Sequence, residues 1–338
     1  MQITTTPFPT RPSNAASRAP VSGHDAATVE LEDRPVQADT HYEDGTPRSD
    51  LSTYAQIRTG SPSTSPLGKV VAAAMLGGGL WTAANIASQV ASAGPAGVAL
   101  AAGALVAGYA AADLSSGIFH HWVDNYPTPE TPVVGKMAKE FQEHHFRTYD
   151  LLEVSFLDNC VNAGRFLAPV MGLVAAANPH YAVAASALAF LTGGYLAQGS
   201  HRWTHMENPP RIGKVLQNLG LAQSKKSHAM HHRMPWSDYY CIVNGMWNPL
   251  LSKVDFWRKL ENVYFQATGA EPKSWRDQGV KQLALGQISK QEFLANQNVN
   301  RKAFGQLIHQ EREFWRQQDQ ARRHELSANS QPQPGQRP

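Results

Sequence analysis

The chain alternates between long apolar segments and polar segments that carry its histidine clusters. Residues 70–112 contain no charged residue. Within them, residues 70–90 and 94–112 are each long enough to cross a hydrocarbon core, which takes about 20 residues of helix. Gly94 and Pro95 predict a turn between them. We expect a helical hairpin in a membrane; a buried hairpin of a soluble protein is the alternative.

A second apolar pair follows further along the chain. Residues 164–177 and 181–199 are split by the sequence Asn178-Pro179-His180, and the first member is short. The first pair, residues 70–90 and 94–112, is rich in Ala and Gly, and small residues permit close packing of helices in lipid. The pattern predicts an all-α integral membrane protein with about four transmembrane helices in two hairpins.

Two hairpins with tight turns place the polar segments on one side of the membrane, namely residues 1–69, 113–162 and 200–338. Every histidine cluster and nearly all Lys and Arg lie in these segments. Since positive residues favour the cytosolic side, we expect one histidine-rich cap that holds two metals at the cytosolic face. His180 falls on the opposite side and is not expected to be a ligand.

Three regions are predicted: a leader (1–66), a membrane domain (67–276) and a polar helical extension with a disordered end (277–338). The leader is rich in Ser, Thr and Pro, carries eight Asp or Glu, and has too few large apolar residues to fold. It resembles bacterial type III secretion leaders, which would deliver the protein to host membranes. An organelle transit peptide fits the acidic residues poorly, and a plain flexible tail is the other alternative.

Composition excludes several classes of protein. The net charge is +3, so the chain is not a strongly basic nucleic-acid binder. Cys160 and Cys241 are the only cysteines and can form neither a disulfide framework nor a C-x-x-C zinc site. No glycine-rich nucleotide-binding loop is present. Histidines and carboxylates are therefore the plausible metal ligands.

Histidines occur in four groups, each beside a predicted membrane helix. They are DLSSGIFHHWVD (113–124), FQEHHF (141–146), QGSHRWTH (198–205) and SHAMHH (227–232). The third group places His201 and His205 four residues apart, which puts them on one helical face. In the fourth, His228, His231 and His232 have the spacing i, i+3 and i+4, so all three rings can point at one centre.

Eight or nine imidazoles exceed the four or so ligands of one zinc ion and suit two metals in one pocket. Abundant nitrogen and little sulfur favour iron and O₂ chemistry. A structural or pH-sensing histidine cluster is the alternative. Lys225, Lys226 and Arg233 flank the fourth group; they could hold a lipid phosphate, dock an electron carrier or reflect the positive-inside rule.

Two acidic residues near the membrane boundary are costly unless they are used. Asp124 is interpreted as a ligand or as an acceptor that orients an imidazole. Asp113 could equally be a helix-end residue in water. His121 neighbours His120 and points elsewhere on a helix, so a supporting role or substrate contact is expected. Asp124 and His121 are the candidate catalytic residues.

These motifs resemble the lipid desaturase family, which includes plasmanylethanolamine desaturase, the Kua proteins, bacterial CarF and a plant plastid phosphatidylglycerol desaturase. The matching pieces lie between about residues 68 and 276: D-x-x-x-G-x-x-H at 113–120, Asp124, Glu143-His144-His145, Asp158-Asn159-Cys160, His201-x-Trp203-x-His205 and His228-x-x-His231-His232. The run 231–251 is similar in particular to the plant branch. One departure is His121, which stands where the family usually has Trp.

The resemblance implies a four-helix membrane desaturase with a di-iron centre, O₂ as co-substrate and a phospholipid as substrate. The implied ligands are His120, His144, His145, His201, His205, His228, His231 and His232. Electrons would come from cytochrome b5 or ferredoxin, because no flavin or haem motif is present. Rival interpretations are a lipid hydroxylase with the same iron site, an inactive membrane adaptor and, more distantly, a zinc hydrolase.

Overall fold

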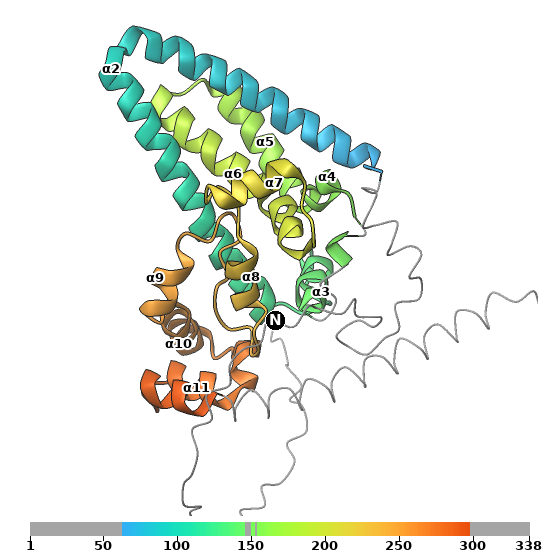
Figure 1. The fold of residues 1–338 in the computed structure, drawn as a ribbon, viewed down its shortest axis with the longest axis vertical. Helices are drawn as coiled ribbons and strands as arrows, with labels where there is room; N and C mark the ends of the chain where they lie inside the picture. Colours follow the sequence, from blue (N-terminus) through green and yellow to red (C-terminus); the bar gives the residue numbers. More distant parts are fainter. Residues whose placement is uncertain (1–62, 146–149, 153, 298–338) are drawn as a thin grey trace, which may run out of the picture. The chain divides into compact units, whose positions relative to one another are not determined.

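The computed structural model describes residues 63–145, 150–152 and 154–297, and these form helices and loops without a strand (Figure 1). The elements are α2 (Pro66–Asn125), α3 (Gly135–His144), η1 (Asp150–Leu152), α4 (Phe156–Asn159), α5 (Val161–Ala177), α6 (Tyr181–His205), α7 (Arg211–Asn218), α8 (Lys225–His231), α9 (Asn248–Lys253), α10 (Phe256–Thr268), η2 (Lys273–Arg276) and α11 (Gln278–Ala284). Residues 290–297 are also helical. The all-helical prediction is confirmed for the described residues.

Helix α2 bends back on itself at Gly94. The helix starts at the cap Ser65, whose hydroxyl accepts from the backbone N–H of Gly68 at 3.0 Å. At Gly94 the backbone takes φ = 65° and ψ = −164°, which glycine adopts without steric cost, and Pro95 follows. Residues 66–93 and 95–125 are thus two helical arms, as the turn prediction expects. The second arm continues past residue 112, however, and carries the first histidine group on the same helix.

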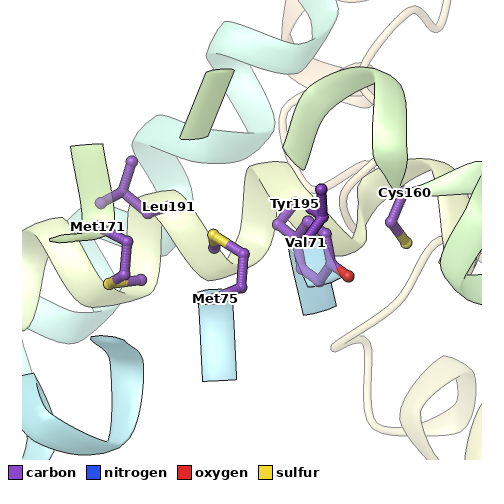
Figure 2. Close-up of a cluster of buried hydrophobic side chains, with 6 residues drawn as sticks. All are labelled: Val71, Met75, Cys160, Met171, Leu191 and Tyr195. Atoms are coloured by element: carbon purple, nitrogen blue, oxygen red, sulfur yellow. The ribbon is translucent and has the colours of Figure 1, made fainter. Parts of the chain in front are cut away.

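Helices α5 and α6 pack against the arms of α2 (Figure 1). Figure 2 shows part of this core, a cluster of buried side chains: Val71, Met75, Cys160, Met171, Leu191 and Tyr195. At Gly108 of α2, an added Cβ would lie 2.1 Å from the carbonyl oxygen of Ser186 on α6. The small residue at this contact therefore lets α2 and α6 approach closely.

The two turns of the hairpins lie together at one end of the helices. The Gln89 amide donates to the side chain of Asn178 at 3.2 Å and to the carbonyl of Pro179 at 3.1 Å. Its carbonyl oxygen accepts from the N–H of Tyr181 at 2.9 Å. His180 lies beside these residues and bonds the N–H of Ala182 at 3.3 Å. The remaining ends of α2 and α6 lead into the histidine groups.

Much of the apolar surface of these helices is exposed. Helices α2 and α6 are long and apolar enough to cross a bilayer, and α5 is a shorter apolar helix of 17 residues. Only 11 % of the most apolar window of α2 is buried. Large side chains on this surface include Val70, Leu76, Leu80, Trp81, Val106 and Leu173. A buried soluble hairpin would hide such groups, so the surface favours lipid contact. The four-crossing topology and its sidedness stay predictions.

The C-terminal part of the described chain packs on the rest through a small core. Trp275, Val280 and Ala284 are buried, and Phe265 and Phe293 pack against them. Most of the leader and all residues beyond 297 lie outside the described residues. The predicted disorder of both ends, and the boundaries at 66/67 and 276/277, therefore stay predictions.

Candidate metal centre

Five imidazoles from three helices converge on one point and form the first group. They are His144 at the end of α3, His201 and His205 on α6, and His228 and His232 at the end of α8. One donor atom of each lies within 4.8 Å of those of the others. The Nε2 atoms of His228 and His205 are 2.7 Å apart, and those of His201 and His228 are 2.8 Å apart. The Nε2 atoms of His144 and His205 are 3.0 Å apart.

Hydrogen bonding between the rings does not account for these short separations. His201, His205 and His228 make three mutual Nε2 contacts of 2.7–3.3 Å, and His201 Nδ1 also donates to the side-chain oxygen Oε1 of Gln198 at 2.9 Å. Four such bonds need four protons, whereas three neutral imidazoles carry three. Imidazole nitrogens about 2.0–2.1 Å from a shared metal lie roughly 2.8–3.4 Å apart. The observed separations of 2.7–3.3 Å lie within this range or just below it, and they fit that arrangement better than hydrogen bonding between the rings.

A second group combines three imidazoles with one carboxylate. It consists of His120 and Asp124 on α2, His145 after α3, and His231 on α8. Asp124 Oδ2 lies 3.3 Å from His120 Nε2, 3.5 Å from His145 Nε2 and 3.7 Å from His231 Nε2. Both Asp124 oxygens are buried without a hydrogen-bond partner among the described residues. Because an unpaired buried carboxylate is unfavourable, a bound cation would compensate it.

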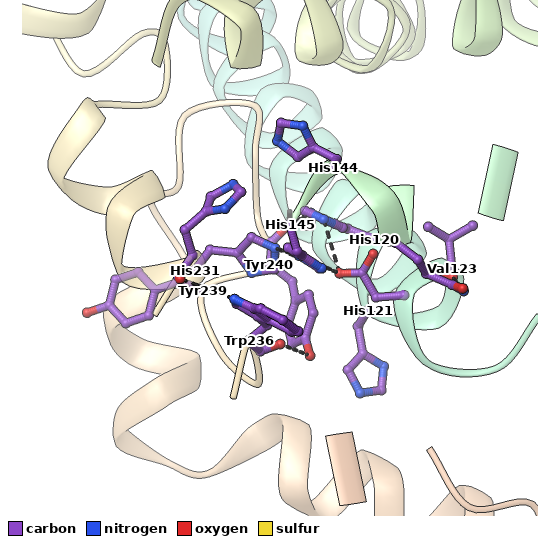
Figure 3. A network of polar contacts seen from close by, with 12 residues as sticks. His120, His121, Val123, His144, His145, His231, Trp236, Tyr239 and Tyr240 are labelled. Carbon is purple, nitrogen blue, oxygen red and sulfur yellow. Dashed lines mark hydrogen bonds and ion pairs between the residues drawn. The ribbon is translucent and has the colours of Figure 1, made fainter. Parts of the chain in front are cut away.

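Residues 236–240, here called the strap, contact the outer side of the second group (Figure 3). His120 Nδ1 donates to the carbonyl oxygen of Tyr240 at 3.0 Å, and His231 Nδ1 donates to that of Asp238 at 2.9 Å. A carbonyl only accepts, so both rings carry their proton on Nδ1 and turn the Nε2 lone pair inward. The indole of Trp236 stacks on His145, with ring centroids 5.0 Å apart and an interplanar angle of 5°.

Burial keeps these imidazoles neutral. Desolvation lowers the pKa of His231 to about 4, although its bond to the Asp238 carbonyl acts in the opposite direction. Desolvation also moves the pKa of His145 well below its usual value, and the nearby His231 adds to this shift. Neutral imidazole is the form that binds a metal ion. Both rings are therefore ready to act as ligands at neutral pH.

The structure brings together all eight histidines expected as ligands, and Asp124 with them. The prediction that His228, His231 and His232 point at one centre is wrong. His228 and His232 belong to the first group and His231 to the second, because adjacent residues on a helix point in different directions. The neighbours His144 and His145 are divided between the groups in the same way.

His121 lies outside both groups. Figure 3 shows its ring directed away from His120 and His145. The Nε2 atom lies 3.2 Å from Glu261 Oε1, and the ring stacks on Trp257 at 5.1 Å. A supporting role is consistent with these contacts, and a catalytic role for His121 stays a prediction.

Glu261 is a buried residue that the sequence analysis missed. It is fully buried and accepts from Arg258 at 2.6 Å, Ser274 Oγ at 2.8 Å and Trp275 Nε1 at 3.0 Å. This network fastens α10 and η2 to the helix that carries His120. The i, i+3 spacing of Arg258 and Glu261 could have indicated an ion pair, but the same spacing is common on solvated helices.

Asp113 is not a helix-end residue in water, because its carboxylate holds a loop of the protein. It is buried within α2, and its Oδ1 accepts from the N–H groups of Asn244 at 3.0 Å and Gly245 at 2.9 Å. Its Oδ2 accepts from the N–H of Trp247 at 3.3 Å. The carboxylate thus fixes the loop that follows the strap.

Together, the fold and the site define an all-helical protein in which long apolar helices position two groups of metal-ligand side chains. The family follows from comparison with known proteins. Residues 109–275, about half of the chain, match the lipid desaturase domain family. The matched residues contain all eight expected ligand histidines and Asp124.

Similar proteins come from plants and bacteria. The chain is 34 % identical over 179 residues to fatty acid desaturase 4-like 1, chloroplastic, of Arabidopsis thaliana, which covers 52 % of this chain and 60 % of the relative. It is 35 % identical to fatty acid desaturase 4, chloroplastic, of the same plant over 51 % of this chain and 54 % of the relative. Plasmanylethanolamine desaturase of Myxococcus xanthus is 32 % identical over 53 % of this chain and 65 % of its own length. The chain thus spans between half and two thirds of these relatives. No solved structure matches it significantly.

Proposed function

We propose that this protein is a membrane lipid desaturase that places a double bond in a hydrocarbon chain of a phospholipid. The reaction removes two hydrogens from adjacent carbons, and O₂ with two external electrons and two protons yields two waters. The observation that carries the proposal is the pair of adjacent ligand groups, nearly all nitrogen, at the ends of apolar helices.

The residues present fit two iron ions. The first group offers imidazole nitrogens alone, and the second adds the carboxylate of Asp124, whose buried oxygens have no hydrogen-bond partner among the described residues. Imidazole and carboxylate ligands suit iron, and neither group contains a cysteine. Bound iron would supply the activation of O₂. His120, Asp124, His145 and His231 would hold one ion; His144, His201, His205, His228 and His232 would hold the other.

The chain itself supplies orientation and a dry environment. His120, His201, His228 and His231 are each at most 2 % exposed, so water has little access to the ligand nitrogens. The carbonyls of Asp238 and Tyr240 hold two rings in the tautomer that binds metal. Exposed apolar side chains on α2 and α5 would place the site beside lipid, where a hydrocarbon chain can reach it.

Substrate and electron donor are further parts of this proposal. The relatives include fatty acid desaturases and plasmanylethanolamine desaturases, so both ester-linked acyl and ether-linked alkyl chains are candidate targets. We propose cytochrome b5 or ferredoxin as the electron donor and the cytosolic face as the location of the site. Delivery to host membranes by the leader, residues 1–66, remains a sequence-based hypothesis.

The test is lipid analysis of cells that contain both ester and ether phospholipids and express the full chain with each electron donor. His231→Ala is the inactive partner, and His180→Ala is the matched control because its imidazole lies at the opposite end of the helices. We expect the parent and His180→Ala to remove two hydrogens from one lipid class, and His231→Ala to leave that class unchanged.

Other outcomes would replace the proposal. Gain of one oxygen in place of hydrogen loss would show a hydroxylase. The adaptor interpretation would be favoured if all three strains had identical lipids. This outcome requires that the parent protein is in the membrane, is loaded with two irons and is supplied with either donor. Activity that persists without O₂ would point to hydrolysis.

A further inference from the structure

The strap contacts every imidazole of the second group at alternate residues. Trp236 stacks on His145, the Asp238 carbonyl accepts from His231, and the Tyr240 carbonyl accepts from His120. The position of the strap therefore sets the direction of three ligands at once.

The backbone of the strap is held in a conformation that large residues rarely adopt. Trp236 has φ = 56° and Tyr239 has φ = 60°, in the left-handed region that glycine prefers. Such geometry persists only where surrounding bonds enforce it. Tyr240 Oη donates to the Trp236 carbonyl at 2.8 Å, Asp238 Oδ1 accepts from the Tyr239 N–H at 2.8 Å, and Arg258 donates to the Ser237 carbonyl at 2.7 Å.

One of these supports leads to the C-terminal end of the described chain. Ser252 Oγ donates to Asp238 Oδ2 at 2.6 Å. The carbonyl of Ser252 accepts from Lys290 Nζ at 2.7 Å, and Lys290 also pairs with Asp255 at 2.7 Å. Lys290 thus lies at the C-terminal end of α9, where a cation is favourable. A continuous path runs from Lys290 through Ser252 and Asp238 to His231.

The C-terminal segment, defined here as residues 278–297, lies outside the part of the chain that matches the family, residues 109–275. It also forms one side of a cleft of about 290 Å³, in which Leu283, Phe293 and Leu294 face Met230 and Tyr239. The hydrogen bonds at Ser252 and Asp238 connect this segment to the strap.

We propose that the C-terminal segment braces the second metal group, with Asp238, Ser252 and Lys290 as positioning residues for His231. This inference rests on the proposed function, since it treats the two groups as metal sites. Outer hydrogen bonds orient metal ligands, and their loss typically lowers metal affinity 10- to 100-fold. Loosening the brace would let the strap relax and weaken the second group selectively.

The first experiment compares Lys290→Met with Lys281→Met in the full chain, purified from membranes and loaded with iron. Lys281 is the matched control: it belongs to the same segment and pairs with Glu271 at 2.8 Å, away from the strap. Iron per chain is measured during titration with a chelator. We expect Lys290→Met to lose one of two irons at about tenfold lower chelator concentration, and Lys281→Met to match the parent.

A second comparison separates positioning from general destabilisation. In a His231→Ala background the remaining iron belongs to the first group, so adding Lys290→Met should not change its retention. In a His228→Ala background the remaining iron belongs to the second group, and Lys290→Met should weaken it about tenfold. Ser252→Ala, a smaller change, should act in the same direction, and Lys290→Arg should restore retention.

The failures are distinguishable. A parent protein that binds no iron would overturn both this inference and the proposed function. If the parent binds two irons and Lys290→Met and Ser252→Ala retain iron as well as the parent does, the inference about the C-terminal segment is overturned and the proposed function is not. Loss of both irons together, with an equal fall in the unfolding temperature of the iron-free protein, would show a structural role and would also overturn it.

Discussion

The two ligand groups use the same residue type but are supported differently. In the first group His201 has an outer hydrogen bond, to Gln198, whereas the Nδ1 atoms of His144 and His228 are buried without a partner among the described residues. In the second group, two of three imidazoles donate to carbonyls of the strap and the third stacks on its indole. The second group also has a carboxylate.

The two groups therefore differ in how their side chains are held as well as in composition. Five imidazoles offer more donors in the first group, but their orientation depends mainly on the helices that carry them. In the second group, outer contacts also fix the tautomer and direction of the rings. We therefore expect the second group to be preorganised and the first to be more adjustable. Three predictions test that contrast.

The largest effect is expected from removing one ligand of either group. His228 has Nε2 contacts of 2.7 and 2.8 Å with two other rings, so His228→Ala should empty the first group and lower desaturation at least about 100-fold. Because the second group has its own support, it should keep its iron. Iron per chain should fall from two to one by elemental analysis; loss of both would show that the groups are not independently supported.

Asp124→Asn should change metal binding and metal-free stability in opposite directions. The amide keeps the shape but removes the charge, so the second group should bind iron about 10- to 100-fold more weakly. Without metal, the change removes a buried, unpaired carboxylate and should raise the free energy of unfolding by about 1–3 kcal/mol. Thermal unfolding with and without iron measures both effects.

Asp113→Asn is the control for this carboxylate. Asp113 accepts three backbone N–H groups, so its loss should destabilise the protein with and without iron. Equal responses of the two variants would mean that Asp124 also has a structural role and is not a metal-site residue.

The smallest effect is expected from Gln198→Met, which removes the outer bond of His201 and keeps a similar side-chain volume. Iron retention in the first group should fall up to about tenfold, and retention in the second should not change. Chelator titration in the His231→Ala background measures the first group alone. An effect as large as that of His228→Ala would contradict the view that the first group depends chiefly on its helices.

Much of the helical framework could be predicted from the sequence because it follows from hydropathy and helical periodicity. The break at Gly94 and the connection at 178–180 were readable from turn residues. The i, i+4 pairing of His201 with His205 is confirmed by their 3.3 Å contact. The division of neighbouring histidines between two groups could not be predicted from the sequence, because it depends on where three helices meet.

Other parts of the site leave little trace in a sequence. The strap acts through the carbonyls of Asp238 and Tyr240, and every residue has a carbonyl. Glu261 looks like a solvated helix residue until α10 packs against α2. Asp113 caps backbone groups more than 130 positions away, a distance beyond any local pattern. Tertiary contacts decide each of these.

Helix α8 contributes a histidine to each of the two groups. It supplies His228 to the first group and His231 to the second, with ring centroids 5.9 Å apart. Three residues of α-helix advance about 4.5 Å along the axis, and a hydrogen-bonded turn is stiff. A rigid-body displacement of α8 would thus carry one ligand of each group in the same direction.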